Sequence, residues 1–409
     1  MSYTFYVFLY CLVLFLLMLF KGGKSKYELY LLLVLPVLIY VHSFLDPNTI
    51  ADLPLYRESF ADVRLTNVFN PVDLEIYRSF HKEEFGFILL LKLVGLFTHD
   101  FNVFLCLYSC LLLGVYSYVI LKLSPNVCLS ILFLMVIVFD QSIFVLRQHL
   151  SVAFVLLTIP SIIERKIWRF TAIMTIAILF HKSSLIWGII YFMYGMKKPW
   201  KIFVVLGLVA IGLGLVFSFL SFLNEQLSLG YSSYIDGESA GKSNLVSFFL
   251  GLGLFLSYFF ICRKKIFENG LMKVCLLSLY VYVVLSLVGI SISLLSRFTL
   301  VFQTSLFFVI PIVCKMLKNK WLKFGYVSSC LICFAYINYF GSFSVNLANT
   351  KLFVFGTKQM LFYLVFTGIT LYGVIYLYER HLKADKKKRL IRKKEISITS
   401  SRKKRCISK

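Results

Sequence analysis

Residues 126–146 read NVCLSILFLMVIVFDQSIFVL, and this stretch decides which kind of fold to expect. It is apolar over nearly its whole length, and about 20 such residues cross the hydrocarbon core of a bilayer as a helix. Similar runs stand on either side of it, at residues 101–121 and 147–163. Backbone that faces lipid must satisfy its own hydrogen bonds, so these runs should be helices. The sequence therefore predicts an all-α, polytopic integral membrane bundle.

The composition of the chain agrees with that prediction. Of 409 residues, 59% are hydrophobic and 15% are charged, and the mean hydropathy is +0.84. Soluble domains carry roughly 25% charged residues. This chain has too little polar surface to cover a soluble globule.

The net charge of +24 could suggest a nucleic-acid binder, but its location argues otherwise. Residues 380–409 hold 14 Lys or Arg against two acids, so this segment alone contributes 14 − 2 = +12. Most other basic residues lie in short loops beside apolar runs, which is the positive-inside pattern. We expect residues 379–409 to be a disordered cytoplasmic tail near anionic lipid, with no nucleic-acid partner.

The apolar runs and the Lys/Arg-rich loops together predict a topology of about 12–14 transmembrane helices. Residues 1–378 form one membrane domain, with the N-terminus outside and the C-terminus in the cytoplasm. The longer polar loops, at about 46–84, 224–243 and 341–357, should then be extracytoplasmic. Residues 85–97 are apolar but short for a span and contain Lys92, so an interfacial or re-entrant segment fits better.

Residues 167–196 are the most informative part of the topology. They lie between a basic cluster at 165–169 and another at 197–201, and a single crossing would place one of these clusters outside. Two short helices that break near His181 keep both clusters inside. Broken helices at membrane depth occur where they are buried in protein or line a wet cavity. The charge pattern therefore predicts a cavity at His181.

Ionisable groups inside spans cost about 2.5–3.5 kcal/mol each, so each one suggests a function. The first such place is Arg147-Gln148, with Asp140 seven residues earlier and hence on the same face of a continuous helix. An alternative is a structural Asp–Arg pair with the arginine reaching to the interface.

The second place is His181 with the three residues that follow it, Lys182, Ser183 and Ser184. The third place is Arg297. A packed histidine and an interfacial arginine are the structural alternatives. By the topology, all three places lie toward the outer face. Two guanidinium groups and an imidazole there would suit a dianionic head group, because arginine binds phosphate oxygens bidentately and stays charged.

The polar loop at 46–84 adds further candidates for binding a sugar or serving as a base. A solvated loop would have the same composition, and on composition alone that interpretation is favoured. The candidates are Asp52, Tyr56, Arg57 and Glu84.

At these residues the chain resembles the EpsG-like branch of the Wzy-type polysaccharide polymerases. The resemblance is carried by VLRQHLSVA at 145–153 and AILFHKSSL at 177–185, and more weakly by Arg297-Phe298 and the residues around Tyr56 and Glu84. It covers roughly residues 50–310. His149 stands where the family pattern would have a small or aliphatic residue.

The resemblance implies a bacterial plasma-membrane glycosyltransferase that works without metal, nucleotide or other cofactor. A glycan on a polyprenyl diphosphate would pass to a hydroxyl of an incoming lipid-linked repeat unit. Arg147 and Arg297 would stabilise the departing diphosphate, and His181 would deprotonate the acceptor, with Glu84 or Asp140 as the other candidate base. Membrane lipid, a chain-length regulator and a flippase of the same pathway are the implied partners; capsule, O-antigen and exopolysaccharide are the candidate products.

Two other classes of protein share this topology. A flippase for lipid-linked oligosaccharides also has cationic residues for diphosphate, but it should distribute them through a central cavity and often has repeated halves. An O-antigen ligase or an acyltransferase would share the outward Arg and His residues.

Overall fold

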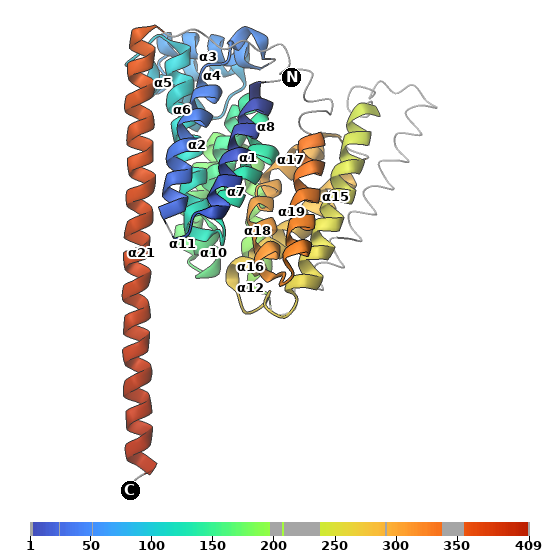
Figure 1. The fold of residues 1–409 in the computed structure, drawn as a ribbon. Coiled ribbons are helices and arrows are strands. Elements are labelled where there is room, and N and C mark those ends of the chain that lie inside the picture. The colour runs from blue at the N-terminus through green and yellow to red at the C-terminus, as the bar shows by residue number, and fades with distance from the viewer. Residues whose placement is uncertain are drawn as a thin grey trace.

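The structure is a computed structural model, and it is a bundle of helices (Figure 1). It describes residues 3–23, 25–50, 52–196, 207, 238–290, 293–337 and 356–407. The predicted span at 203–223 and most of the loops at 224–243 and 341–357 lie outside the described residues.

The first half of the bundle comprises membrane-length helices and a group of short helices inserted after the second one. In chain order the elements are α1 (Tyr3–Phe20), α2 (Ser25–Ser43), the 3₁₀ turn η1 (Pro47–Thr49), α3 (Leu53–Leu65), α4 (Pro71–His81), α5 (Phe85–Gly95), α6 (Phe101–Leu123), α7 (Val127–Leu134), the π-helix η2 (Met135–Phe139), α8 (Asp140–Phe144), α9 (Leu146–Leu156), α10 (Ile159–Ile163) and α11 (Ile167–Phe180).

The second half continues with a broken segment and then longer helices. Its elements are the 3₁₀ segment η3 (Lys182–Trp187), α12 (Gly188–Gly195), α15 (Glu238–Cys262), α16 (Gly270–Gly289), α17 (Ser293–Gln303), α18 (Leu306–Met316), α19 (Lys320–Ala335) and α21 (Thr357–Ile407).

Eight of the helical segments within the described residues are long and apolar enough to cross a membrane. Three shorter apolar helices accompany them, at Thr4–Phe20, Phe85–Gly95 and Ile167–Phe180. The predicted all-α polytopic bundle is therefore confirmed, and the chain is a multi-pass membrane protein.

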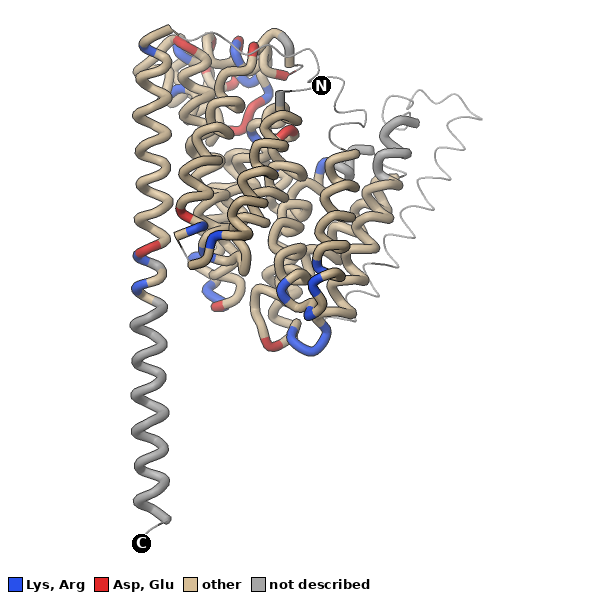
Figure 2. The backbone as a smooth tube through the Cα atoms, viewed as in Figure 1, with Lys and Arg blue, Asp and Glu red and all other residues tan. Residues whose placement is uncertain are grey.

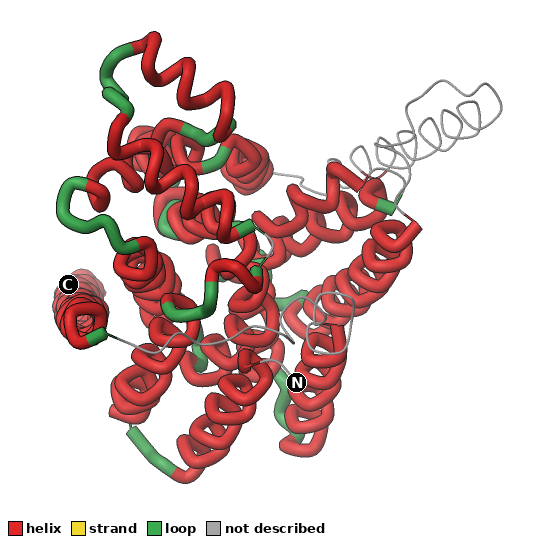
Figure 3. The backbone as a smooth tube through the Cα atoms, turned by 90° about the horizontal axis from the view of Figure 1, so that it is seen from above, coloured by secondary structure: helices red, strands yellow, loops and turns green. Residues whose placement is uncertain are grey.

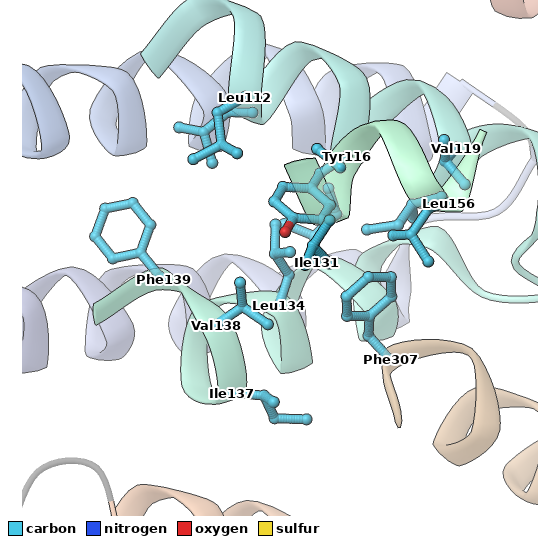
Figure 4. Close-up of a cluster of buried hydrophobic side chains, with 14 of the residues drawn as sticks. Leu112, Tyr116, Val119, Ile131, Leu134, Ile137, Val138, Phe139, Leu156 and Phe307 are labelled. Carbon is cyan, nitrogen blue, oxygen red and sulfur yellow. The ribbon is translucent and has the colours of Figure 1, made fainter. Parts of the chain in front are cut away.

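The centre of the first half is an apolar core in which α6, α7, η2 and α9 meet (Figure 4). Leu112, Ile131, Val138 and Leu156 there are at most 2% exposed. Phe307 of α18 joins this cluster, and its carbonyl accepts a hydrogen bond from the hydroxyl of Ser130 at 2.6 Å. One contiguous core thus connects the two halves of the bundle.

The two ends of the bundle differ in charge (Figure 2). Lys and Arg of the loops after α15 and α18 gather at the end toward which α21 extends, whereas most carboxylates lie at the end that carries α3 and α4. The N-terminal end of α1 lies near that acidic end (Figure 1).

Seen from above in Figure 3, many helices are viewed close to end-on, because they run roughly parallel.

The last helix, α21, continues past residue 378 to Ile407. Lys, Arg, Leu and Ala are among the strongest helix formers, and a helix that continues an existing one needs no new nucleus.

The predicted break near His181 is confirmed. α11 ends at Phe180, His181 is extended (φ −162°, ψ 124°), and η3 and α12 carry the chain back. A contact between the two ends of this segment shows that the chain returns to its starting side. Arg165 precedes α11, and its guanidinium carbon lies 4.1 Å from the ring centre of Tyr191 in α12. Arg165 Nη1 also donates to the carbonyl of Tyr191 at 2.5 Å. Residues 167–195 thus form a hairpin that begins and ends at the same side of the bundle.

Candidate functional site

The carboxylate of Glu84 is the centre of the candidate site. Its Oε2 accepts a hydrogen bond from Arg147 Nη1 at 2.7 Å, and its Oε1 lies 2.8 Å from His181 Nδ1. The side chains of Glu84, Arg147 and His181 are 12%, 24% and 26% exposed. Arg147 and His181 are 63 and 97 positions from Glu84 in the sequence, yet the three side chains form one partly buried cluster.

The backbone before Glu84 helps to hold this cluster. Lys82 ends α4 in the left-handed conformation (φ 49°), which non-glycine residues adopt at some cost. Its carbonyl accepts a second hydrogen bond from Arg147 Nη1, at 3.1 Å. Glu84 then stands at the N-cap of α5, where the helix dipole favours a negative charge.

Arg147 owes its position to a break in the preceding span. Residues 127–144 are not one regular helix, because η2 is a π-helix and Val145 leaves helical geometry (φ −110°, ψ 65°). α9 begins again at Leu146, so Arg147 lies in its first turn. The dipole at that end disfavours a cation, and Glu84 offsets this cost.

The same break makes the predicted common face of Asp140 and Arg147 wrong. The seven-residue spacing assumed a continuous α-helix. Instead, Asp140 is 4% exposed and its Oδ2 accepts a hydrogen bond from Thr4 Oγ1 of α1 at 3.3 Å. It does not contact Arg147 or Glu84 through any hydrogen bond or ion pair that the structure describes.

Two buried hydroxyls satisfy the backbone at the His181 break. Ser151 Oγ of α9 donates to the carbonyl of Ala177 at 2.5 Å, and the hydroxyls of Ser151 and Ser184 are hydrogen-bonded to each other. The amide of Ser184 donates to the carbonyl of His181 at 3.2 Å. These bonds satisfy the carbonyls of Ala177 and His181 where the helix ends inside the protein.

Gly86 lets α5 approach α11 closely. A Cβ atom at this position would lie 2.7 Å from the carbonyl oxygen of Leu179, in the last turn of α11. No side chain other than hydrogen fits there without a shift of one of the two helices. This contact brings Glu84, two residues before Gly86, within reach of His181.

A cavity of about 410 Å³ lies beside the cluster and is lined by residues from both halves of the bundle. Its polar lining includes Arg147, Gln148 and His181 on one side and Arg297 of α17 on the other. The apolar part of the lining consists of Val145, Leu250, Leu300, Phe334 and Ile337.

Arg297 differs from Arg147 in having no carboxylate partner among the described residues. Its carbonyl accepts a hydrogen bond from Gln148 Nε2 at 2.6 Å, which ties α17 to α9. Its side chain is exposed and lines the cavity. The guanidinium is therefore available to an anion that enters.

The two adjacent carboxylates of the turn stand in opposite environments. Burial of Glu84 by itself raises its pKa, but the hydrogen bond and charge of His181 and the charge of Arg147 outweigh burial and lower the pKa to about 2. Burial raises the pKa of Glu83, which is 5% exposed and accepts a hydrogen bond from the Tyr77 hydroxyl at 3.0 Å. Glu84 is thus a permanently ionised partner for His181 rather than a proton acceptor near neutral pH.

Some of the other predicted site residues line the cavity and some do not. Asp52 and Tyr56 line the cavity, and the Arg147 guanidinium lies 6.0 Å from the Tyr56 ring centre. Arg57 lines a different, smaller hollow, and Lys182 is exposed and outside the cavity lining. Ser184 stabilises the break, and the buried Ser183 Oγ has no hydrogen-bond partner among the described residues.

The sequence reasoning missed several polar residues of the cavity wall: Gln141, Ser247, Tyr282, Thr299 and Gln303. Thr299 and Gln303 are four residues apart, which places both on one helical face just after Arg297. That spacing could have identified them. Ser247 and Tyr282 come from separate helices, and no local pattern marks them.

Within the described residues, no group of three or more His, Cys, Asp or Glu side chains could hold a metal ion.

The fold is thus a multi-pass helical bundle with a cavity between its two halves, and the lining of that cavity combines cationic, polar and apolar side chains. The model of the EpsG family matches residues 28–355, and the chain belongs to this family of Wzy-like polysaccharide polymerases. This confirms the resemblance seen in the sequence. A search of curated proteins found no significant match, and neither did a search of solved structures.

Proposed function

We propose that this protein is a polysaccharide polymerase of the outer face of a bacterial plasma membrane. It transfers a glycan from a polyprenyl diphosphate to a hydroxyl of an incoming lipid-linked repeat unit. The observation that carries the proposal is the Glu84 carboxylate, which joins Arg147 to His181 at the wall of a cavity also lined by Arg297.

His181 is the general base in this proposal. With Nδ1 bonded to the ionised Glu84, Nε2 is the ring nitrogen left for a substrate hydroxyl. Glu84 orients the imidazole and stabilises the imidazolium that forms, as carboxylate partners of catalytic histidines do. Asp140, buried beside α1, has no such partner and no place in the mechanism.

The transfer step then balances as follows. The acceptor oxygen attacks the anomeric carbon of the donor glycan while its proton moves to His181 Nε2. The bond between that carbon and the phosphate oxygen breaks, and the polyprenyl diphosphate leaves with the electron pair. Arg297 and Arg147 stabilise the charge that develops on it.

The division of the cavity lining suits such a substrate. The phosphates and sugar would lie against the polar wall at Arg147, His181 and Arg297, with Tyr56 and Asp52 at the sugar. The first isoprene units would lie against Leu250, Phe334 and Ile337.

The direct test uses cells that lack the chromosomal gene and express variants from a plasmid. Arg147→Ala and His181→Ala should abolish long polymer while single repeat units on their lipid carrier still reach the outer face. Polymer of normal length in both variants would contradict the proposal. Repeat units trapped on the inner face would instead favour a flippase.

A further inference from the structure

Helix α4 presents three distinct faces, and one of them is unexplained by packing within the chain. Tyr77 is 4% exposed and packs toward α3, donating to the Ser59 carbonyl at 3.2 Å. Glu75, Arg78 and Ser79 form an exposed polar face. The third face consists of Val72, Ile76 and Phe80, which are 63%, 56% and 78% exposed.

The spacing of these residues makes the third face a continuous apolar stripe. Val72, Ile76 and Phe80 are four residues apart, so successive members are offset by only about 40° around the helix. Leu65 at the end of α3 and Phe69 just after it are 90% and 78% exposed, so two more large apolar side chains precede α4. An aqueous loop has no reason to expose five large apolar side chains between residues 65 and 80.

Exposed apolar side chains also lie beside the junction of α3 with α5. Lys92 of α5 donates to the carbonyls of Arg64 and Thr66 at 2.8 and 2.9 Å, which joins the end of α5 to the end of α3. Beside this junction, Leu96 and Phe97 are 66% and 86% exposed. Figure 1 shows α3, α4 and α5 together at the acidic end of the bundle, where the long helices end.

We propose that α4 is an interfacial helix whose apolar stripe lies in the lipid of the leaflet at this end of the bundle. An amphipathic helix in this position buries its apolar side chains at the boundary between head groups and acyl chains and keeps its polar face in water. The third face then needs no protein partner. The stripe is Leu65, Phe69, Val72, Ile76 and Phe80.

This assignment sets the depth of the candidate site. α4 ends at His81, and the next residue, Lys82, holds Arg147 through its carbonyl. The stripe therefore places the Glu84 cluster near the level of the lipid head groups, where the diphosphate of any membrane-bound lipid carrier lies. The membrane contact itself does not depend on the proposed polymerase reaction.

The test places a tryptophan on each of two faces of α4 in the full-length protein. Phe80→Trp and Ile76→Trp put the indole on the stripe, and Glu75→Trp puts it on the polar face as the matched control. Each variant is reconstituted into phosphatidylcholine/phosphatidylglycerol vesicles, with or without bromine on the upper part of the acyl chains. Fluorescence of the unsubstituted protein is subtracted.

The stripe variants should be quenched by brominated lipid at least about twice as strongly as Glu75→Trp. Having two stripe variants guards against one that fails to fold, and thermal unfolding of each identifies such a failure. Absence of quenching in both folded stripe variants would overturn the proposal. Blue-shifted but unquenched emission, with a chemically cross-linked dimer, would assign the stripe to a second copy of the chain instead.

Discussion

The two walls of the cavity differ in how their charged side chains are paired. On the wall formed by α5, α9 and α11, the cation Arg147 is already paired with Glu84, and His181 is held by the same carboxylate. On the wall formed by α15, α16, α17 and α19, the guanidinium of Arg297 has no ion-pair partner in the described chain, and four of the eight other lining residues on that wall are apolar. Arg147 on the first wall is fixed by an ion pair within the protein, whereas Arg297 on the second wall has no such partner among the described residues.

This difference matters for the electrostatics of binding. A guanidinium that is already paired loses part of its attraction for an incoming anion, but its position is set before the ligand arrives. An unpaired guanidinium beside apolar residues gains more from an anion that excludes water. The comparison therefore predicts that the first wall supports chemistry and the second supports binding.

Loss of the imidazole should have the largest effect. We expect His181→Ala to lower the polymerisation rate about 10²–10⁴-fold, the usual contribution of general acid–base catalysis. The measurement is polymer length and amount on gels, from cells with matched protein levels. Lys182→Ala, which changes an exposed neighbour outside the cavity, is the control and should retain wild-type polymer.

Arg297→Ala should lower activity about 10²-fold, because it removes a charged donor to the leaving diphosphate. In vesicles with purified lipid-linked repeat unit, the apparent KM should rise as well, because Arg297 also binds the diphosphate before the reaction. Arg297→Lys should recover only part of it, since lysine lacks the bidentate fork. Arg57→Ala removes an exposed cation outside the cavity lining and serves as the control. An unchanged KM in Arg297→Ala would remove the distinction between the two walls.

Gly86→Ala tests the preorganisation of the first wall without touching a charged group. The new Cβ would meet Leu179 and push α5 away from α11, so we expect a fall in activity of about tenfold. Gly188→Ala, where the added Cβ has no heavy atom within 4 Å, should be silent. If Gly86→Ala polymerised normally, close contact of α5 with α11 would not be needed for the site.

The ionised state of Glu84 should be visible in the pH dependence of stability. Its folded pKa of about 2 lies below the ordinary value of 4.5, so its contribution is complete above pH 4.5 and is lost as the pH falls toward 2. The difference in melting temperature between wild type and Glu84→Gln should therefore shrink as the pH falls from about 4.5 toward 2. A difference that already shrinks near pH 6 would mean that the carboxyl is not held ionised.

The smallest effect should come from Asp140→Asn, at most about a twofold change in rate. Asp140 is buried against Thr4 and outside the cavity lining. Polymer assays on this variant beside Glu84→Gln separate the two carboxylates. Severe loss in Asp140→Asn, with the protein still folded, would restore Asp140 as a candidate base.

Much of the fold could be predicted because its main determinants are local in the sequence. Apolar runs of span length identified the helices, and the two basic clusters around residues 167–196 required a break at His181. Both follow from one-dimensional patterns, the length of a run and the side on which lysine and arginine are retained.

The site could be predicted only in part. Arg147, His181 and Arg297 were marked by being polar in apolar surroundings. The role of Glu84 as the bridge between Arg147 and His181 could not be seen, because its partners lie 63 and 97 residues away. Asp140 was assigned to the helical face of Arg147 on the assumption of a continuous α-helix. No proline or glycine in the sequence indicates the π-helix at 135–139 or the break at Val145.

The sequence by itself determined that this protein is a helical membrane bundle, that its chain turns back near His181, and which ionisable groups are unusual in an apolar chain. Hydrophobic length and charge asymmetry act along the chain, so they can be read from it directly. Only the tertiary structure decided which of those groups meet. The close contact at Gly86, the carbonyl of Lys82 and the restarted helix at Leu146 bring Glu84 to Arg147 and His181, and each depends on packing between segments distant in sequence.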